Sequence, residues 1–398
     1  MPCHLDRRHT LALGLALLAA PLPLAVQAAE PIRIGMSGPF TGGSGPMGVS
    51  MRDGARLAVS QINAKGGVLG RPLELVERDD EAKNEVGAQV AQELISKEKV
   101  VANVGIINTG VALASARFYQ EAQIPLITPG PSGSSLTEQF APPNTDASYI
   151  FRVSLRDRIQ VDMIVNEIIR RKFEKPAILA DSTNYGQLGR DDLVNGLNKK
   201  DIKPVAVEKF NVKDVDMTAQ LLRSKSAGAD VILTYGVGPE LAQIANGMAK
   251  LGWKVPIVGS WTLSMPNFIE NAGANGEGAR MPQTIILSNP DEKKKAFIDG
   301  FAKISGGTRI PGPVWAAQGY DTVYILAAAI TQAGSTAGPK IQHALENLNT
   351  KVDGLIMTYD KPFSAADHEA FKDTSVAVMG EVRGGTIVAT SEDKKGTN

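Results

Sequence analysis

From residue 31 onward, short β-branched runs alternate with longer amphipathic runs, and this rhythm constrains the fold more than any other feature of the chain. The first part predicts strands at 31–36, 73–78, 100–105 and 125–128, separated by helices at 47–64, 85–98 and 110–122. Strands separated by helices of this length form βαβ crossovers and a parallel sheet. The segment 129–147, rich in Pro, Gly, Ser and Asn, interrupts the pattern.

The same rhythm starts again at residue 149. It predicts strands at 149–153, 177–180, 205–210, 230–235 and 256–259, with helices at 157–172, 185–199, 217–227 and 239–251. A Gly- and Asn-rich segment at 271–278 precedes helices at 291–304, 315–333 and 340–348 and closing strands at 354–359, 375–379 and 386–389. The predicted fold class is α/β, with two similar doubly wound units. Periodicity alone does not assign the helix-rich stretch to either unit.

The first residues predict export. A polar, basic start at 1–9 leads into a short apolar stretch that ends in small residues at Val26-Gln27-Ala28. This order is typical of a secretory signal peptide, here 1–28 with cleavage near Ala28. The apolar run falls short of the roughly 20 residues that a membrane-spanning helix needs. Arg7-Arg8 leaves the twin-arginine export route open beside the general one. We therefore expect a periplasmic protein, with a polar tail at 391–398.

Charge and cysteine content exclude several classes of partner. The whole chain has 42 basic and 42 acidic residues, of which two arginines and one aspartate lie in 1–28, so the remainder carries 40 and 41. This balance argues against nucleic acid as a partner. The single cysteine, Cys3, is expected to leave with the signal peptide, so no disulfide or cysteine metal site is predicted. We expect no cofactor.

Gly43-x-Gly45-x-x-Gly48 matches the dinucleotide-binding pattern GxGxxG and lies between a predicted strand and a predicted helix. However, Pro46 offers no N–H to a pyrophosphate, and six residues separate the strand end from Gly43. We favour a glycine-rich loop whose N–H groups face a ligand. An exported nucleotide-dependent oxidoreductase remains the alternative.

Catalytic constellations are sparse, and we expect a protein that is not an enzyme. His343 and His368 belong to no spaced metal-ligand set, so both are predicted at the surface. Asp79 and Asp80 form a carboxylate pair, which we interpret as a solvated strand end.

A polar, Gly-rich or hydroxyl-bearing loop follows the end of each of six predicted strands. These loops lie at 41–48, 108–110, 130–135, 181–186, 235–239 and 260–262. Open parallel sheets bind ligands at the carboxyl ends of their strands, where helix N-termini favour anions. Six such loops from two units predict a ligand cleft between them.

These loops carry a resemblance to the branched-chain amino-acid type of periplasmic solute-binding protein, the receptor of an ABC importer. It is strongest in IGMSGPF (34–40), GARLAVSQINAKGGVLG (54–70), IPLITP (124–129), DSTNYG (181–186) and GYDTVY (319–324). The resemblance implies two lobes joined by three crossing strands, near 151–153, 280–283 and 354–357. The N-terminal lobe would then comprise 29–152 and 283–353, and the C-terminal lobe 153–282 and 354–390.

The resemblance also implies a function and a site: a monomer that captures a small organic acid or amino-acid-like ligand by lobe closure and delivers it to an inner-membrane permease. The ligand carboxylate would be held by Thr109, Gly130 and Ser132. The full set of candidate ligand-binding residues is Ser44, Met47, Asn108, Thr109, Gly130, Pro131, Ser132, Tyr185, Tyr235 and Trp261.

Two departures from the family pattern stand out. Family members that bind amino acids have a disulfide at the positions of Ala82 and Asn108, which this chain lacks. They also place a glutamate, which pairs with the ligand ammonium, where this chain has Trp261. We therefore expect a keto or aromatic carboxylate without an α-amine, unless another acid such as Asp181 or Glu240 reaches the amine.

Overall fold

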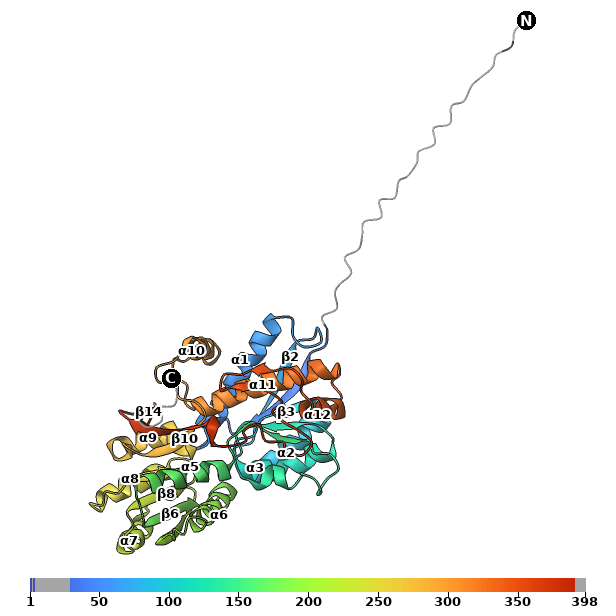
Figure 1. Ribbon diagram of the computed structural model, residues 1–398. Coiled ribbons are helices and arrows are strands. Elements are labelled where there is room, and N and C mark those ends of the chain that lie inside the picture. The colour runs from blue at the N-terminus through green and yellow to red at the C-terminus, as the bar shows by residue number, and fades with distance from the viewer. Residues whose placement is uncertain (2, 4–28, 391–398) are drawn as a thin grey trace.

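The computed structural model describes residues 1, 3 and 29–390 (Figure 1). Most of the predicted signal peptide and the whole predicted polar tail at 391–398 therefore lie outside the described residues. Within the part that is described, no helix combines the length and apolar character needed to cross a membrane.

The first sheet has five parallel strands in the order β2-β1-β3-β4-β5. These are β1 (Ile32–Gly38), β2 (Leu73–Asp79), β3 (Ala102–Val104), β4 (Leu126–Thr128) and β5 (Ile150–Arg152). The crossover helices are α1 (Gly45–Ala64), α2 (Asn84–Ser96) and α3 (Thr109–Glu121). Ile32, Ile34 and Met36 of β1 are fully buried, as expected for an interior strand of a sheet covered on both faces.

The second sheet repeats this order. Its parallel part, β7-β6-β8-β9-β10, is extended by β13 and β14, which pair antiparallel beside β10. The strands are β6 (Pro176–Asp181), β7 (Ala206–Phe210), β8 (Val231–Tyr235), β9 (Ile257–Gly259), β10 (Arg280–Gln283), β13 (Val378–Arg383) and β14 (Thr386–Ala389). Its helices are α5 (Asp157–Arg170), α6 (Asn184–Asn198), α7 (Thr218–Ser226), α8 (Glu240–Lys250) and α9 (Pro266–Ala272). The α/β class with two doubly wound units is confirmed.

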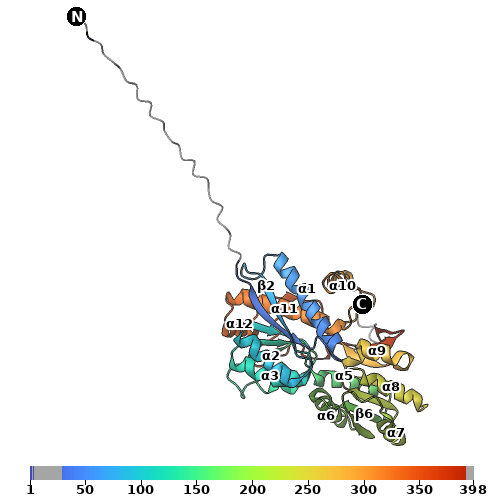
Figure 2. The ribbon, with the colours of Figure 1, turned by 180° about the vertical axis from the view of Figure 1, so that it is seen from behind.

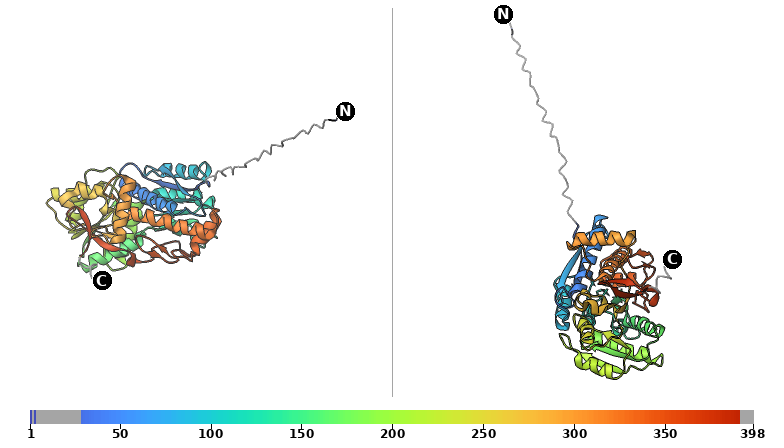
Figure 3. Two further views of the ribbon diagram at one scale, coloured as in Figure 1. Left: turned by 90° about the horizontal axis from the view of Figure 1, so that it is seen from above. Right: turned by 90° about the vertical axis from the view of Figure 1, so that its left-hand side faces the viewer.

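The helix-rich stretch forms α10 (Glu292–Ser305), α11 (Pro313–Ala333) and α12 (Gly338–Glu346). The long helix α11 packs along α1, so it covers the first sheet (Figure 2). Gly54 of α1 makes this packing close, because a Cβ there would lie 2.0 Å from the carbonyl oxygen of Ala316. The right-hand view in Figure 3 shows orange helices beside the blue elements of the first sheet, at the end of the molecule opposite the yellow-green helices of the second.

The segment 354–359 is not the single strand that its sequence predicts. The chain instead forms a short hairpin of β11 (Val352–Asp353) and β12 (Thr358–Tyr359). The buried carboxylate of Asp321, on α11, accepts hydrogen bonds from the N–H groups of Leu355 and Ile356 and from the hydroxyl of Tyr359. These three bonds anchor the turn to the first unit.

The third crossing is also displaced from its predicted place near 354–357. Arg152 of β5 donates its N–H to the carbonyl of His368 at 2.9 Å, and its own carbonyl accepts from the N–H of Ala370 at 2.9 Å. The chain therefore stays beside the first sheet as far as residue 370 and reaches β13 only afterwards. The other lobe boundaries stay predictions.

Two residues predicted at the surface are buried. His368 is 6% exposed and stacks on Phe151 with ring centroids 3.9 Å apart, because residues 368–370 run beside β5. Asp80 is fully buried, and burial raises its pKa to about 7, whereas its neighbour Asp79 is partly exposed. His343 is exposed, as predicted.

A fully buried arginine, Arg152, connects the end of β5 to two other segments. Its guanidinium forms an ion pair with Glu369 at 2.8 Å. It also donates to the carbonyl of Gly133 at 2.8 Å and to the hydroxyl of Thr137 at 2.9 Å. One side chain thus holds the loop after β4, which contains Gly133, next to the segment that contains Glu369.

We expect Arg152→Met to lower the free energy of unfolding by about 3–5 kcal/mol, because it leaves the carboxylate of Glu369 buried without its partner. The matched control is Arg309→Met, which removes an exposed pair with Glu270 and should cost about 1 kcal/mol or less. Urea denaturation of both variants measures the difference. Equal losses would show that the buried pair does not stabilise the fold.

Candidate ligand-binding cleft

A small cavity lies where the carboxyl ends of the two sheets face each other. Its lining comes from loops after strands of both units and from the start of α11, namely Met47, Ile107, Asn108, Thr109, Gly130, Ser132, Tyr185, Val237, Trp261, Thr262 and Trp315. The enclosed space is about 20 Å³, enough for about one water molecule. A larger ligand therefore enters only when the two units separate or these side chains move.

The first unit contributes hydrogen-bond donors. Thr109 begins α3, and no side chain caps this helix, so its first N–H groups remain available. The hydroxyl oxygen of Thr109 accepts from the N–H of Gly133 at 3.2 Å, which leaves its proton free to be donated into the cavity. Gly130 exposes its backbone to the cavity, and no larger residue fits there, because a Cβ at this position would lie 2.6 Å from the Cα of Ile107. Together with Ser132, these groups form a site suited to an anion.

Asn108 adds a polar side chain whose orientation is fixed by Ser44, a residue outside the cavity lining. Its side-chain N–H donates to the hydroxyl of Ser44 at 3.1 Å, while its oxygen Oδ1 is buried and has no hydrogen-bond partner among the described residues. Ser44 itself does not line the cavity. The position of Ser44 therefore indicates that it orients Asn108 and does not contact a ligand in the cavity itself.

The second unit contributes aromatic walls. Tyr185, at the start of α6, has a buried hydroxyl with no partner among the described residues. The ring of Tyr235 packs behind it with centroids 5.0 Å apart, and the hydroxyl of Tyr235 donates to Asp157 at 2.9 Å. Tyr235 is fully buried and does not line the cavity, so it supports Tyr185.

Two tryptophans meet across the cavity. Trp261 follows β9 and Trp315 lies in the first turn of α11, and their ring centroids are 5.5 Å apart at an interplanar angle of 57°. The backbone of Trp261 is fixed on both sides: its N–H donates to Gln160 at 3.1 Å and its carbonyl accepts from Ser264 at 2.7 Å. The indole of Trp261 is therefore a rigid wall.

Of the ten residues predicted from the sequence, seven line the cavity: Met47, Asn108, Thr109, Gly130, Ser132, Tyr185 and Trp261. Ser44, Pro131 and Tyr235 lie behind it; the carbonyl of Pro131 accepts from the hydroxyl of Ser154 at 2.7 Å.

Four lining residues were missed by sequence reasoning. Val237 and Thr262 belong to loops that the sequence singles out, and Ile107 is the last residue before another. Trp315 is different, because no polar loop or strand end marks the start of α11 as part of a site.

The eleven lining residues, all of which the structure describes, include no charged side chain. Asp181 uses one oxygen for Thr183 and the other for the N–H of Val237 at 2.9 Å, so it organises loops of the second unit. Glu240 accepts from the N–H of Lys213. Neither acid reaches the cavity.

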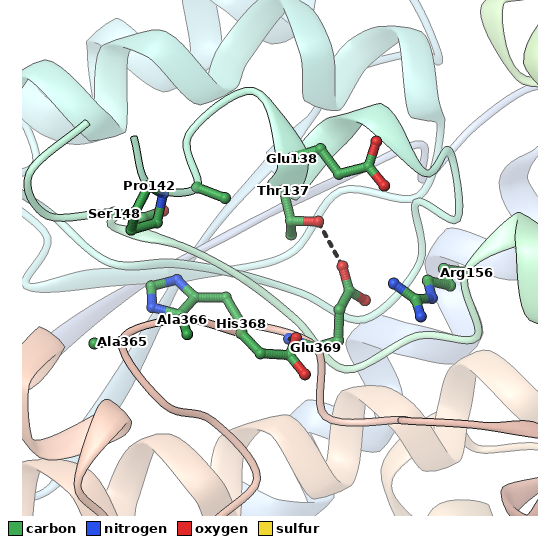
Figure 4. Close-up of a pocket in the computed structure, with 11 residues that line it drawn as sticks. Thr137, Glu138, Pro142, Ser148, Arg156, Ala365, Ala366, His368 and Glu369 are labelled. Carbon is green, nitrogen blue, oxygen red and sulfur yellow. Dashed lines mark hydrogen bonds between the residues drawn. The ribbon is translucent and has the colours of Figure 1, made fainter. Parts of the chain in front are cut away.

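A second cavity, of about 250 Å³, is lined by Thr137 and Glu138, which follow the loop that carries Ser132, and by residues 365–369 (Figure 4). Thr137 and Glu369 meet at its wall through a hydrogen bond, and Arg156 and His368 also line it. Because Thr137 and Glu369 both bind Arg152, this cavity borders the side chains that hold the loop of the first cavity.

Known proteins agree with this architecture. The "Leu/Ile/Val-binding protein homolog 3" of Brucella melitensis is 26% identical over 359 residues, covering 89% of this chain and 94% of that protein. A periplasmic binding protein type 1 from Bordetella pertussis has a TM-score of 0.80 at 27% identity, covering 91% of this chain and all of that one. The branched-chain amino acid transporter substrate binding protein LivJ of Streptococcus pneumoniae, in complex with isoleucine, has a TM-score of 0.77 at 25% identity, with 90% and 98% covered.

These relatives are binding proteins, so the alternative of an exported oxidoreductase, which rested on the GxGxxG match, is wrong. The model of the periplasmic binding protein family matches residues 31–386, nearly the whole of the described chain. The chain belongs to the periplasmic binding protein family, as a type I member of the branched-chain amino-acid importer kind.

Proposed function

We propose that this protein is the periplasmic receptor of an ABC importer and that it captures a small carboxylate without an α-amine by closure of its two lobes. One observation carries the proposal: an uncharged cavity between the lobes has anion-binding donors on one side and aromatic walls on the other. Residues 1–28 act as a signal peptide cleaved near Ala28. The mature protein is a monomer that docks on an inner-membrane permease.

The carboxylate end of the ligand is met by the first lobe. The hydroxyls of Thr109 and Ser132, the N–H of Gly130 and the uncapped start of α3 surround one region of the cavity. Charge-assisted hydrogen bonds from such groups stabilise an anion without a cationic side chain. Because the donors are partly preorganised by Gly133 and Arg152, little order is lost on binding.

The absence of an acid among the lining residues supports a ligand without an ammonium group. A buried ammonium without a partner costs several kcal/mol, enough to remove most of a micromolar affinity. The ring face of Trp261 would return only about 0.5–2 kcal/mol through a cation–π contact. Trp261 and Trp315 instead suit the flat or branched apolar part of a keto or aromatic acid. The Brucella relative is named for binding Leu, Ile and Val, and the Streptococcus protein was solved with isoleucine, so branched-chain amino acids are the competing ligand class.

Lobe closure gives the permease a way to distinguish the ligand-bound receptor from the empty one. The hydrogen-bond donors come from the first lobe, whereas Tyr185 and Trp261 come from the second, so only a ligand that bridges both stabilises the closed arrangement. The two sets of side chains leave a cavity of about 20 Å³ between them, so a ligand held there contacts both lobes.

The carboxylate site is tested by the double variant Thr109→Ala with Ser132→Ala. Each lost charge-assisted hydrogen bond should cost about 1.5–3 kcal/mol, so calorimetry should show affinity reduced by at least a hundredfold. Ser134→Ala is the matched control, because this serine lies in the same loop, bonds to Asp192 and does not line the cavity. Thr109→Ser, which keeps the hydroxyl, should restore most of the affinity lost by Thr109→Ala. A double variant within twofold of wild type would place the carboxylate elsewhere.

The ligand class is tested by matched pairs that differ only at the α-carbon. We expect the keto acid of leucine to bind more tightly than leucine, and phenylpyruvate more tightly than phenylalanine, because only the amino acids bury an unpaired ammonium. Thermal shift followed by calorimetry compares both pairs. Tenfold tighter binding of the amino acid in each pair would contradict the proposal.

A further inference from the structure

A buried carboxylate, Asp157, connects the two lobes directly behind the cavity. It begins α5, just after the chain leaves β5. Its N–H donates to the carbonyl of Ser132 in the first lobe at 2.8 Å, and its Oδ1 accepts from the hydroxyl of Tyr235 in the second lobe at 2.9 Å. The side chain is fully buried, and Oδ2 has no hydrogen-bond partner among the described residues.

The neighbours of Asp157 are the groups that would hold the ligand. Ser132 lines the cavity on one side, and Tyr235 contacts the cavity-lining ring of Tyr185 on the other. Asp157 is therefore separated from the proposed carboxylate site by a single layer of side chains. A negative charge placed there interacts with the charge on Asp157 through protein rather than water, where screening is weak.

Two further charged groups face Asp157 from the surrounding elements. Asp192 of α6 adds a negative charge, and Arg152 of β5 adds a positive one that is already paired with Glu369. Burial is the largest effect and raises the pKa of Asp157 to about 7, while the nearby side chains of Ser132 and Tyr235 act in the opposite direction. Its carboxyl group therefore changes charge near neutral pH.

We propose that Asp157 is a positioning residue that takes up a proton when a carboxylate ligand binds, so that capture of the anion is coupled to neutralisation of the acid behind it. The inference rests on the proposed function, because it requires an anion between Ser132 and Tyr185. It adds that one titrating group senses the charge of the ligand while holding both lobes.

The direction of the pH dependence follows from the charge states. Below pH 7 Asp157 is already neutral, so a carboxylate binds without proton uptake and its affinity is constant. Above pH 7 Asp157 is charged in the free protein, and the incoming anion either meets a like charge or binds while Asp157 takes up a proton from the solvent. Affinity then falls by up to about tenfold per pH unit, and proton uptake approaches one per ligand.

The experiment is titration calorimetry with the keto acid of leucine, at pH 6 and pH 8, in buffers of different ionisation enthalpy. For the wild type we expect uptake near zero at pH 6 and approaching one proton at pH 8. Asp157→Asn, which keeps an oxygen to accept from Tyr235, should abolish both the uptake and the loss of affinity between the two pH values. Asp80→Asn is the matched control: burial also raises the pKa of this aspartate to about 7, but none of its hydrogen bonds involves a residue that lines the cavity. It should keep the uptake.

A spectroscopic measurement keeps the test valid if Asp157→Asn does not fold. Infrared difference spectra of the wild type at pH 8 should show one carboxyl group becoming protonated on ligand addition. Normal binding at pH 8 with no proton uptake, or uptake that persists in Asp157→Asn, would overturn the coupling while leaving the proposed function intact. If the wild type binds no carboxylate even at pH 6, the proposed function fails and the coupling fails with it. Tighter amino-acid binding accompanied by proton release would instead identify Asp157 as the partner of an ammonium.

Discussion

The site depends on one buried interaction, the ion pair between Arg152 and Glu369. An unpaired guanidinium in this position would be strongly destabilising, so the carboxylate must be present for β5 to end where it does. The remaining N–H groups of Arg152 bind the carbonyl of Gly133 and the hydroxyl of Thr137. These contacts set the path of the loop between β4 and β5, which carries Gly130 and Ser132 into the cleft. The geometry of ligand binding is therefore determined by residues that do not touch the ligand.

The cleft itself follows from the repeated strand order of the two sheets. In each sheet the strand order reverses beside the first strand, between β1 and β3 in one unit and between β6 and β8 in the other. Loops on either side of such a point leave in opposite directions and open a crevice at the carboxyl ends of the strands. Two crevices that face each other give a cavity lined from both sides. Its donors come from the first sheet's loops, whereas its aromatic walls come from both units, Tyr185 and Trp261 from the second and Trp315 from α11 beside the first sheet.

Much of this could be predicted from the sequence because it is encoded locally. The alternation of β-branched and amphipathic runs predicts the strands and helices, and the polar loops at strand ends mark the segments that contain Thr109, Ser132 and Tyr185. The choice of these three residues within the loops came from the resemblance to the family. Features that depend on contacts between distant segments could not be predicted in this way. Trp315 reaches the cavity because α11 packs back along α1, and its own surroundings in the sequence resemble any apolar helix.

The sequence also misplaced residues whose environment is made by another segment. His368 has polar neighbours in sequence, yet it is buried because the backbone of 368–370 pairs with Arg152. The hairpin at 352–359 has the composition of a strand, but the carboxylate of Asp321 captures its backbone N–H groups and bends it. In both places a buried polar group more than thirty positions away determines the local structure, and periodicity carries no information about such a partner.

We propose that a carboxylate binds between the donors of the first lobe and the tryptophan walls, and a crystal structure with the keto acid of leucine tests this arrangement. We expect carboxylate oxygens within about 3.2 Å of the hydroxyls of Thr109 and Ser132, with the branched end of the ligand between Trp261 and Trp315. A ligand bound with its carboxylate away from Thr109 and Ser132, or outside this cavity, would contradict it.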